Sequence, residues 1–328
     1  SGGLLREEGY GKRIYHTILS DYILENMGKD EKKAYHGRAV AFYREKLKYA
    51  RDKQTAPDAL AATRLLEHVL TAESEAAFVK TFIDECMSPL MNLGLLDNAI
   101  ELSERASAYV QRGSHQDAMI LGDSGLIYRM RGDLDKAEKM HNKSLEIDKK
   151  LGLLEDMARQ YGNLGLVYQT RGELEKAERM FTKSLQINEK LGWLRGMAIQ
   201  YGNLGLIYQT RGDLDKAEQM HKESLKIGKK LVCLEIVASQ YSNLGLIYLT
   251  RGELNKAEQT IKKSMDIEEK LGRLEGMAKD YGNLGLVYRT RGDLDKAEQM
   301  HKKAIEINEK LGLLEDMARE YSNLGLIY

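Results

Sequence analysis

The sequence is poor in residues that interrupt or cross-link a fold. Its 328 residues include two prolines, Pro57 and Pro89, two cysteines and one tryptophan. Because proline breaks helices, its scarcity beside abundant Leu, Ala, Glu and Lys favours an all-helical protein. Cys86 and Cys233 lie far apart in the chain, which argues against a disulfide framework and predicts a reducing, cytoplasmic compartment.

The chain also lacks an excess of either charge and any long apolar run. Its 50 basic and 50 acidic residues cancel to a formal net charge of zero. Nucleic-acid-binding domains usually carry a basic excess, so we expect no nucleic-acid partner. No run of 18 apolar residues occurs, which predicts that no helix spans a membrane. Ser1-Gly2-Gly3 lacks the features of a signal peptide, and we expect a tag remnant or an internal boundary there.

What the chain does contain is a repeated unit of 40 residues. The segment Tyr161-Gly-Asn-Leu-Gly-Leu-Val-Tyr168 is followed by close copies that begin at Tyr201, Tyr241, Tyr281 and Tyr321, and a weaker copy begins at Leu121. A second segment, from Arg171 to Glu178, recurs in the same register. Repeats of this length are typical of solenoids, in which each unit buries its apolar face against its neighbours.

Each unit has the pattern of two helices. In one unit the apolar and small residues of the first helix recur at steps of three and four, at Leu154, Met157, Ala158, Tyr161, Leu164, Gly165 and Tyr168. Those of the second helix are Leu174, Ala177, Phe181, Leu185 and Leu191. Gly172 and Gly192 follow the two helices and can adopt the left-handed conformation that ends a helix. The pattern predicts an all-α solenoid of antiparallel helix pairs.

The same residues carry a family resemblance. An aromatic residue, then Leu-Gly, then Tyr, a turn Gly and a small Ala in the second helix resemble the tetratricopeptide signature. The long unit, with Glu189 near the place where that family commonly has a proline, is similar to the repeats of Pins-type adaptors and kinesin light chains. HEAT repeats share the period but not the Leu-Gly-x-x-Tyr pattern. The resemblance implies a right-handed superhelix that holds a protein partner.

The repeat fades towards the N-terminus. We expect an N-terminal helical region over 1–56, divergent helical repeats over 57–113, and a repeat array over 114–328 whose last repeat is truncated after its first helix. Within 75–92, Pro89 should distort a helix. The stretches from Tyr15 to Tyr22 and from His36 to Tyr43 resemble the junction between a winged-helix module and the helical arm of STAND signalling ATPases. The alternative is a simple helical cap.

Motifs for catalysis are missing. No Gly-rich phosphate loop, G-x-S-x-G elbow, H-E-x-x-H or paired C-x-x-C occurs, so we expect no enzyme, no cofactor and no metal site in this chain. His141, His221 and His301 share one position of the repeat with Phe181 and Ile261. A position that accepts Phe and Ile is a packing position, so we interpret these histidines as core residues.

One polar position stands out in the first helices. Asn is a poor residue inside a helix, because its amide competes for backbone hydrogen bonds. It nevertheless recurs in the same place in five repeats, as Asn163, Asn203, Asn243, Asn283 and Asn323. In tetratricopeptide arrays the first helices line a concave groove, so the resemblance implies that these amides hold the main chain of an extended peptide. The alternative is that each Asn bonds to the next repeat and sets the stacking angle.

Further groove residues follow from the same placement. Leu166, Gln169 and Thr170 lie one turn after Asn163, with Leu206 and Gln209 as equivalents in the next repeat. Arg159 and Lys279, one turn before their Asn, could pair with a carboxylate of the partner.

Three functions remain open from the sequence. The leading hypothesis is a protein- or peptide-binding scaffold that forms part of a larger protein. The second is the partner-sensing C-terminal domain of a STAND-type ATPase, whose ATPase domain would lie upstream. The third is weak self-association, in which the open C-terminal end of one array stacks on another copy.

Overall fold

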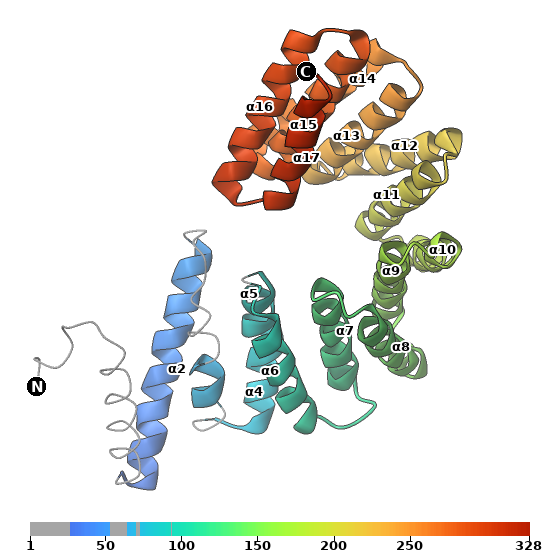
Figure 1. The fold of residues 1–328 in the computed structure, drawn as a ribbon. Coiled ribbons are helices and arrows are strands. Elements are labelled where there is room, and N and C mark those ends of the chain that lie inside the picture. The colour runs from blue at the N-terminus through green and yellow to red at the C-terminus, as the bar shows by residue number, and fades with distance from the viewer. Residues whose placement is uncertain (1–26, 53–63, 70–72, 93) are drawn as a thin grey trace, which may run out of the picture. The chain divides into compact units, whose positions relative to one another are not determined.

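The computed structural model describes residues 27–52, 64–69, 73–92 and 94–328 (Figure 1). These residues form helices joined by short turns, and the described part contains no strand. The chain divides into two compact units, residues 1–147 and 148–328. The stretch 15–22 and the segment around Pro57 lie outside the described residues, so the resemblance to a STAND junction stays a prediction there.

The first unit is a layer of helices around one apolar core. Its helices are α2 (Lys29–Asp52), α4 (Glu75–Thr81), a π-helical turn η1 (Phe82–Cys86), α5 (Met87–Asn92), α6 (Leu96–Ala108), α7 (His115–Met130) and most of α8 (Leu134–Leu151). Val40 of α2, Phe78 of α4 and Ile120 of α7 belong to the same buried cluster. Arg44 adds an ion pair from α2 to Glu85 (3.2 Å).

The π-helical turn lies where proline was expected to distort the helix. The backbone N–H of Met87 donates to the carbonyl of Phe82, five residues earlier. Pro89 has no N–H to donate, and its ring would crowd the carbonyl four residues before it, which is that of Glu85. Widening the helix over Phe82–Cys86 relieves this crowding, as π-turns do at irregular points of helices.

The second unit repeats one helix pair. Its first helices are α9 (Leu154–Thr170), α11 (Leu194–Thr210), α13 (Leu234–Thr250), α15 (Leu274–Arg291) and α17 (Leu314–Gly325). Its second helices are α10 (Leu174–Leu191), α12 (Leu214–Lys230), α14 (Leu254–Leu271) and α16 (Leu294–Leu311). Each first helix packs on its own second helix, and each second helix packs on the next first helix. The all-α architecture of antiparallel helix pairs is therefore confirmed.

The two helices of a pair touch at a glycine. A side chain of the second helix lies directly against a glycine of the first: Phe181 on Gly165, and His221 on Gly205. The same place is filled by His141, Ile261 and His301 in the other pairs. All these side chains are fully buried, so the packing interpretation of the histidines is confirmed.

Helix ends follow the expected glycine pattern. Gly172 has φ +77°, and the backbone N–H of Glu173 donates to the carbonyl of Tyr168 (2.9 Å), as in a Schellman turn. Gly192 ends α10 in the same left-handed conformation. Leu154 and Leu191, which were expected in the core, are exposed because they occupy the ends of their helices.

Successive repeats are also joined by a polar clamp. Glu218 of α12 accepts a hydrogen bond from the hydroxyl of Tyr248 (2.9 Å) and pairs with Arg251, both from the next repeat. Although partial burial opposes it, hydrogen bonds from Lys222, Arg251 and Tyr248 lower the pKa of Glu218 to about 2. Glu258 is held in the same way by the repeat that follows it. These side chains hold successive repeats together. Their polar atoms are used in these contacts.

Candidate functional site

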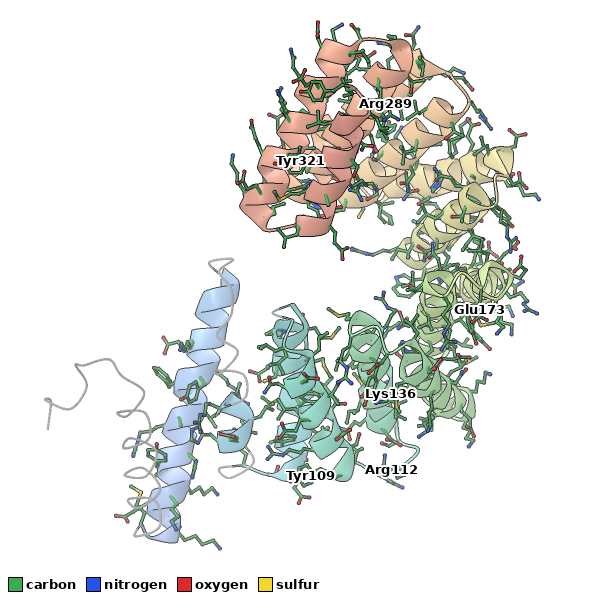
Figure 2. All side chains as sticks on the ribbon, in the orientation of Figure 1. Tyr109, Arg112, Lys136, Glu173, Arg289 and Tyr321 are labelled. Carbon is green, nitrogen blue, oxygen red and sulfur yellow. The ribbon has the colours of Figure 1, made fainter. Side chains whose placement is uncertain are left out.

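Two hollows open along the first helices of residues 148–328. The smaller hollow, of about 170 Å³, is lined mainly by α9 and α11. The larger hollow, of about 520 Å³, is lined mainly by α13, α15 and α17. Neighbouring first helices touch each other, α11 with α13 and α13 with α15. Figure 2 shows the side chains that project from these helices, with Arg289 marking α15 and Tyr321 marking α17.

Most of the predicted asparagines lie in these hollows. Asn163 and Asn203 line the smaller hollow, and Asn283 and Asn323 line the larger one. Asn243 is buried. The hollows therefore lie on the side of the first helices that carries the asparagines, and a ligand role for these residues stays a prediction.

The amides already make two internal hydrogen bonds. Nδ2 of Asn203 lies 3.5 Å from Oε1 of Gln200 on its own helix, which is a weak bond. Nδ2 of Asn283 donates to Oγ of Ser242 on the preceding first helix (3.2 Å). This second bond joins two repeats, as the stacking interpretation expects at that position.

The other predicted groove residues separate into two groups. Arg159 and Leu166 line the smaller hollow, and Lys279 lines the larger one. The remaining four, Gln169, Thr170, Leu206 and Gln209, lie outside the linings of these two hollows.

Two of these side chains also have partners within their own helix. The hydroxyl of Thr170 donates to the carbonyl of Leu166 (2.9 Å). Arg159 pairs with Asp156 of its own helix (3.1 Å).

A row of buried polar residues, not singled out from the sequence, lies on the same helices as the asparagines, three residues before each of them. Its members are Gln160, Gln200, Gln240, Asp280 and Glu320, one from each first helix. In three repeats the side chain lies against a glycine of the preceding first helix, as Gln240 does against Gly202. The signal was present in the sequence, because a polar residue recurs between core positions three residues before it and four after it.

The residue at the histidine position of each repeat determines which hydrogen-bond partner the buried polar side chain of the row finds. Nδ1 of His221 lies 2.7 Å from Oε1 of Gln240, and Nδ1 of His301 lies 2.6 Å from Oε2 of Glu320. Burial lowers the pKa of His221. Where the histidine is replaced by Ile261, the polar residue of the row, Asp280, has to find another partner.

Asp280 finds that partner in a serine. Oδ1 of Asp280 accepts a hydrogen bond from Oγ of Ser242 (2.7 Å), and Ser242 stands where Gly202 and Gly282 stand in neighbouring repeats. Oδ2 of Asp280 is buried and has no hydrogen-bond partner. Burial raises the pKa of Asp280 to about 6.

A second buried carboxyl group lines the same hollow. Glu268 of α14 is 4% exposed, and its Oε2 has no hydrogen-bond donor. The guanidinium of Arg273 forms an ion pair with this oxygen at 3.5 Å, outside the usual length of a charge-assisted hydrogen bond. Burial raises the pKa of Glu268.

The two hollows therefore differ in charge although the repeats are nearly identical. Asn188 and Gln200 line the smaller hollow at the positions that Glu268 and Asp280 occupy in the larger one. The smaller hollow is floored by neutral amides, and the larger by carboxyl groups. Among the described residues, no three His, Cys, Asp or Glu side chains converge as the ligands of one metal ion would.

The repeat pattern matches a known family over most of the chain. A sequence profile of the tetratricopeptide repeat matches residues 90–150, 156–230 and 236–310. The chain belongs to the tetratricopeptide repeat family. The first match begins within the divergent region, so the repeats extend further towards the N-terminus than the clear copies of the signature. No curated protein sequence is significantly similar to the chain.

Solved structures show the same fold. A Rap protein in complex with competence and sporulation factor has a TM-score of 0.60 at 18% identity, over 94% of this chain and 89% of that one. A STAND ATPase with a tetratricopeptide repeat sensor from Pyrococcus horikoshii has a TM-score of 0.58 at 17% identity, over 90% of this chain and 52% of that one. Kinesin light chain repeats from Podospora anserina have a TM-score of 0.51 at 16% identity, over 62% of this chain and 99% of that one. The predicted resemblances to kinesin light chain repeats and to a STAND sensor are thus confirmed at the level of fold.

The structure bears on two predictions, that no helix spans a membrane and that the cysteines form no disulfide. None of the described helices combines the length and apolar composition needed to cross a bilayer. Neither Cys86 nor Cys233 is part of a disulfide bond in the described part of the chain. The cytoplasmic compartment stays a prediction.

Proposed function

We propose that the face formed by the first helices of residues 148–328 is a groove that binds a peptide, or an extended segment of a protein, by its main chain. The proposal rests on one observation: four of the five repeated asparagines line hollows on this face. A primary amide offers a donor and an acceptor, which match the carbonyl and N–H of a peptide unit. The complex of the structurally similar Rap protein with competence and sporulation factor supports a ligand-binding role for this fold.

The test removes two amides that contribute little to the fold. Asn163→Ala with Asn203→Ala is expected to weaken binding of nine-residue peptides, selected on the wild-type chain from a random library, by about tenfold or more. Each lost hydrogen bond to the ligand contributes about 1 kcal/mol. The thermal midpoint should hardly move, because Ala favours a helix and the bond of Asn203 to Gln200 is weak. Fluorescence anisotropy and thermal denaturation measure the two quantities.

The matched control is Asn142→Ala, at an exposed position of α8, which should leave affinity unchanged. Unchanged affinity in the double variant, combined with a lower thermal midpoint, would show that the asparagines fix the repeats and do not hold a ligand.

A second candidate is the sensor domain of a STAND-type ATPase. The observation in its favour is the match of 90% of this chain to about half of such an ATPase. In that case, ligand capture by the groove would shift the equilibrium between an inactive and an active state of the larger protein. The parent gene decides it: a nucleotide-binding domain is expected upstream, and a gene without one excludes this candidate.

Self-association is the weakest of the three proposals. Leu326 and Tyr328 near the last helix, α17, are largely exposed. Light scattering over a concentration series would exclude stacking of copies if only monomer were present.

A further inference from the structure

Two buried carboxyl groups line the larger hollow, and each has one oxygen without a hydrogen-bond donor. Asp280 is 1% exposed, and its Oδ2 has no hydrogen-bond donor. The hydroxyl of Ser264, which also lines the hollow, donates to the carbonyl of Ala238 (2.9 Å). Oε2 of Glu268 is likewise buried without a donor. A buried carboxylate without a full set of partners destabilises a fold, so these two groups carry a cost.

Packing does not require carboxyl groups at these positions. The smaller hollow has Gln200 in place of Asp280 and Asn188 in place of Glu268. Both amides are buried at these equivalent positions, so a neutral side chain fits the fold. Neutral side chains can therefore fill both positions. The position of Glu268 also holds a buried carboxyl group in another repeat, at Asp148, but the larger hollow combines Glu268 with the buried carboxyl group of Asp280, and this combination indicates a functional role.

The basic residues around the larger hollow donate no hydrogen bond to these two oxygens, although Lys279 favours ionisation of both carboxyl groups by its charge. Arg319 pairs with Asp316 (2.6 Å) and with Glu320 (3.6 Å) of its own helix, and its side chain is about 60% exposed. Arg273 approaches Glu268 only at 3.5 Å and is about 45% exposed. These cations are exposed, whereas Asp280 and Glu268 are buried.

The spread of the acidic groups over the hollow favours an organic cation over a metal ion as the ligand. Its acidic groups do not converge on one point as metal ligands would. They come instead from separate helices, Glu268 from α14 and Asp280 from α15, whereas Glu320 of α17 is already paired with His301. An ammonium has three donors and a guanidinium has five, so either can reach carboxylates that lie apart from each other. A volume of about 520 Å³ leaves room for such a side chain.

We propose that the larger hollow receives a basic side chain, arginine or lysine, of the peptide bound in the groove. This inference rests on the proposed function, because it names one residue of the same ligand. The asparagine row holds the main chain of the peptide, and Asp280 with Glu268 sets the specificity at one position along it.

The experiment selects peptides from a random nine-residue library on the wild-type chain and on three variants. Peptides selected by the wild type are expected to share Arg or Lys at one fixed position. Asp280→Asn should abolish that preference, since the amide removes the charge and keeps the shape. Glu269→Gln changes an exposed carboxyl group next to Glu268 on α14, outside the lining of the hollow, and should leave the preference intact.

A selected peptide then measures the size of the effect. Replacing its arginine by citrulline, which has nearly the same shape and no charge, should weaken binding to the wild type at least tenfold. Binding to Asp280→Asn should change less than threefold on the same replacement. Arginine and lysine versions of the peptide show which basic side chain the hollow prefers.

Two results would overturn the inference. Selected peptides that lack a basic position, or share an acidic one, would show that Arg273, Lys279 and Arg319 govern the hollow. If those peptides still bound more weakly to the third variant, Asn163→Ala with Asn203→Ala, the proposed peptide groove would stand. Only the preference for a basic side chain in the larger hollow would be rejected. Enrichment of no peptide by the wild type would overturn both proposals together.

Discussion

Gly165→Ala is expected to lower the free energy of unfolding of residues 148–328 by about 2–3 kcal/mol, the cost of overpacking a core. A Cβ at this position would lie 2.4 Å from Cε1 of Phe181 and 2.5 Å from Cδ1 of the same ring. Phe181 is fully buried, so its ring has no solvent to move into. The strain must separate α9 from α10, and these two helices form one repeat.

The measurement is amide hydrogen exchange, because a repeat array need not unfold in one step. Protection should fall most in α9 and α10. Gly37→Ala is the control: Gly37 also lies within a helix, α2, but a Cβ there would meet no atom within 4 Å. Its replacement should stabilise α2 by about 0.5–1 kcal/mol. If both substitutions raised stability, the close contact between the helices would not limit this fold.

Asp280→Asn is expected to stabilise residues 148–328 above neutral pH. The pKa of Asp280 is raised from 3.8 to about 6 by burial, so ionisation costs the folded state more than the unfolded one. A raised carboxyl pKa contributes stability below pH 4 that is lost as the pH rises through 6. The shift of about two pH units corresponds to about 3 kcal/mol at pH 8, to order of magnitude. Asn avoids that loss and can still accept the hydrogen bond from Ser242.

Urea denaturation at pH 4 and pH 8 checks this prediction. The difference between Asp280→Asn and the wild type should be large at pH 8 and small at pH 4. Lys279 nearby favours the ionised form and Glu268 opposes it, so both are included in the net shift. Glu275→Gln, at an exposed carboxyl group on α15, should show no such pH dependence. An equal effect of Asp280→Asn at the two pH values would mean that Asp280 titrates as an ordinary carboxyl group.

Together the two substitutions separate the scaffold from its site. Gly165 belongs to a contact that every repeat needs, and its replacement should weaken the fold. Asp280 belongs to one hollow, and its replacement should strengthen the fold while removing the specificity proposed for that hollow. A gain in stability with a loss of specificity is the usual sign of a functional residue.

Much of the local structure was predictable from spacing. The helices, the left-handed turn at Gly172 and the packing role of the histidines depend on contacts that recur in each unit, so repetition in the sequence reports them. The distortion near Pro89 was predictable because it follows from the chemistry of one residue. The placement of Asn163 and Asn203 in a hollow followed from the position of the first helices in the family.

Other features depended on neighbours that spacing does not reveal. Gln169 and Gln209 share the helices of the predicted groove but lie outside the linings of the two hollows. Asn283 bonds to Ser242 because a serine replaces glycine on the adjacent helix. A substitution in one repeat thus changes the partners of a residue about 40 positions away.

The sequence by itself determined the repeat, the helix pairs and the face on which polar residues gather, because these follow from periodicity and from the backbone preferences of glycine and proline. Only the tertiary structure decided that Asp280 and Glu268 share one hollow with oxygens that lack donors. Burial and hydrogen bonding depend on which helices meet. Repeats that look alike in sequence can therefore enclose a neutral hollow in one place and an acidic one in another.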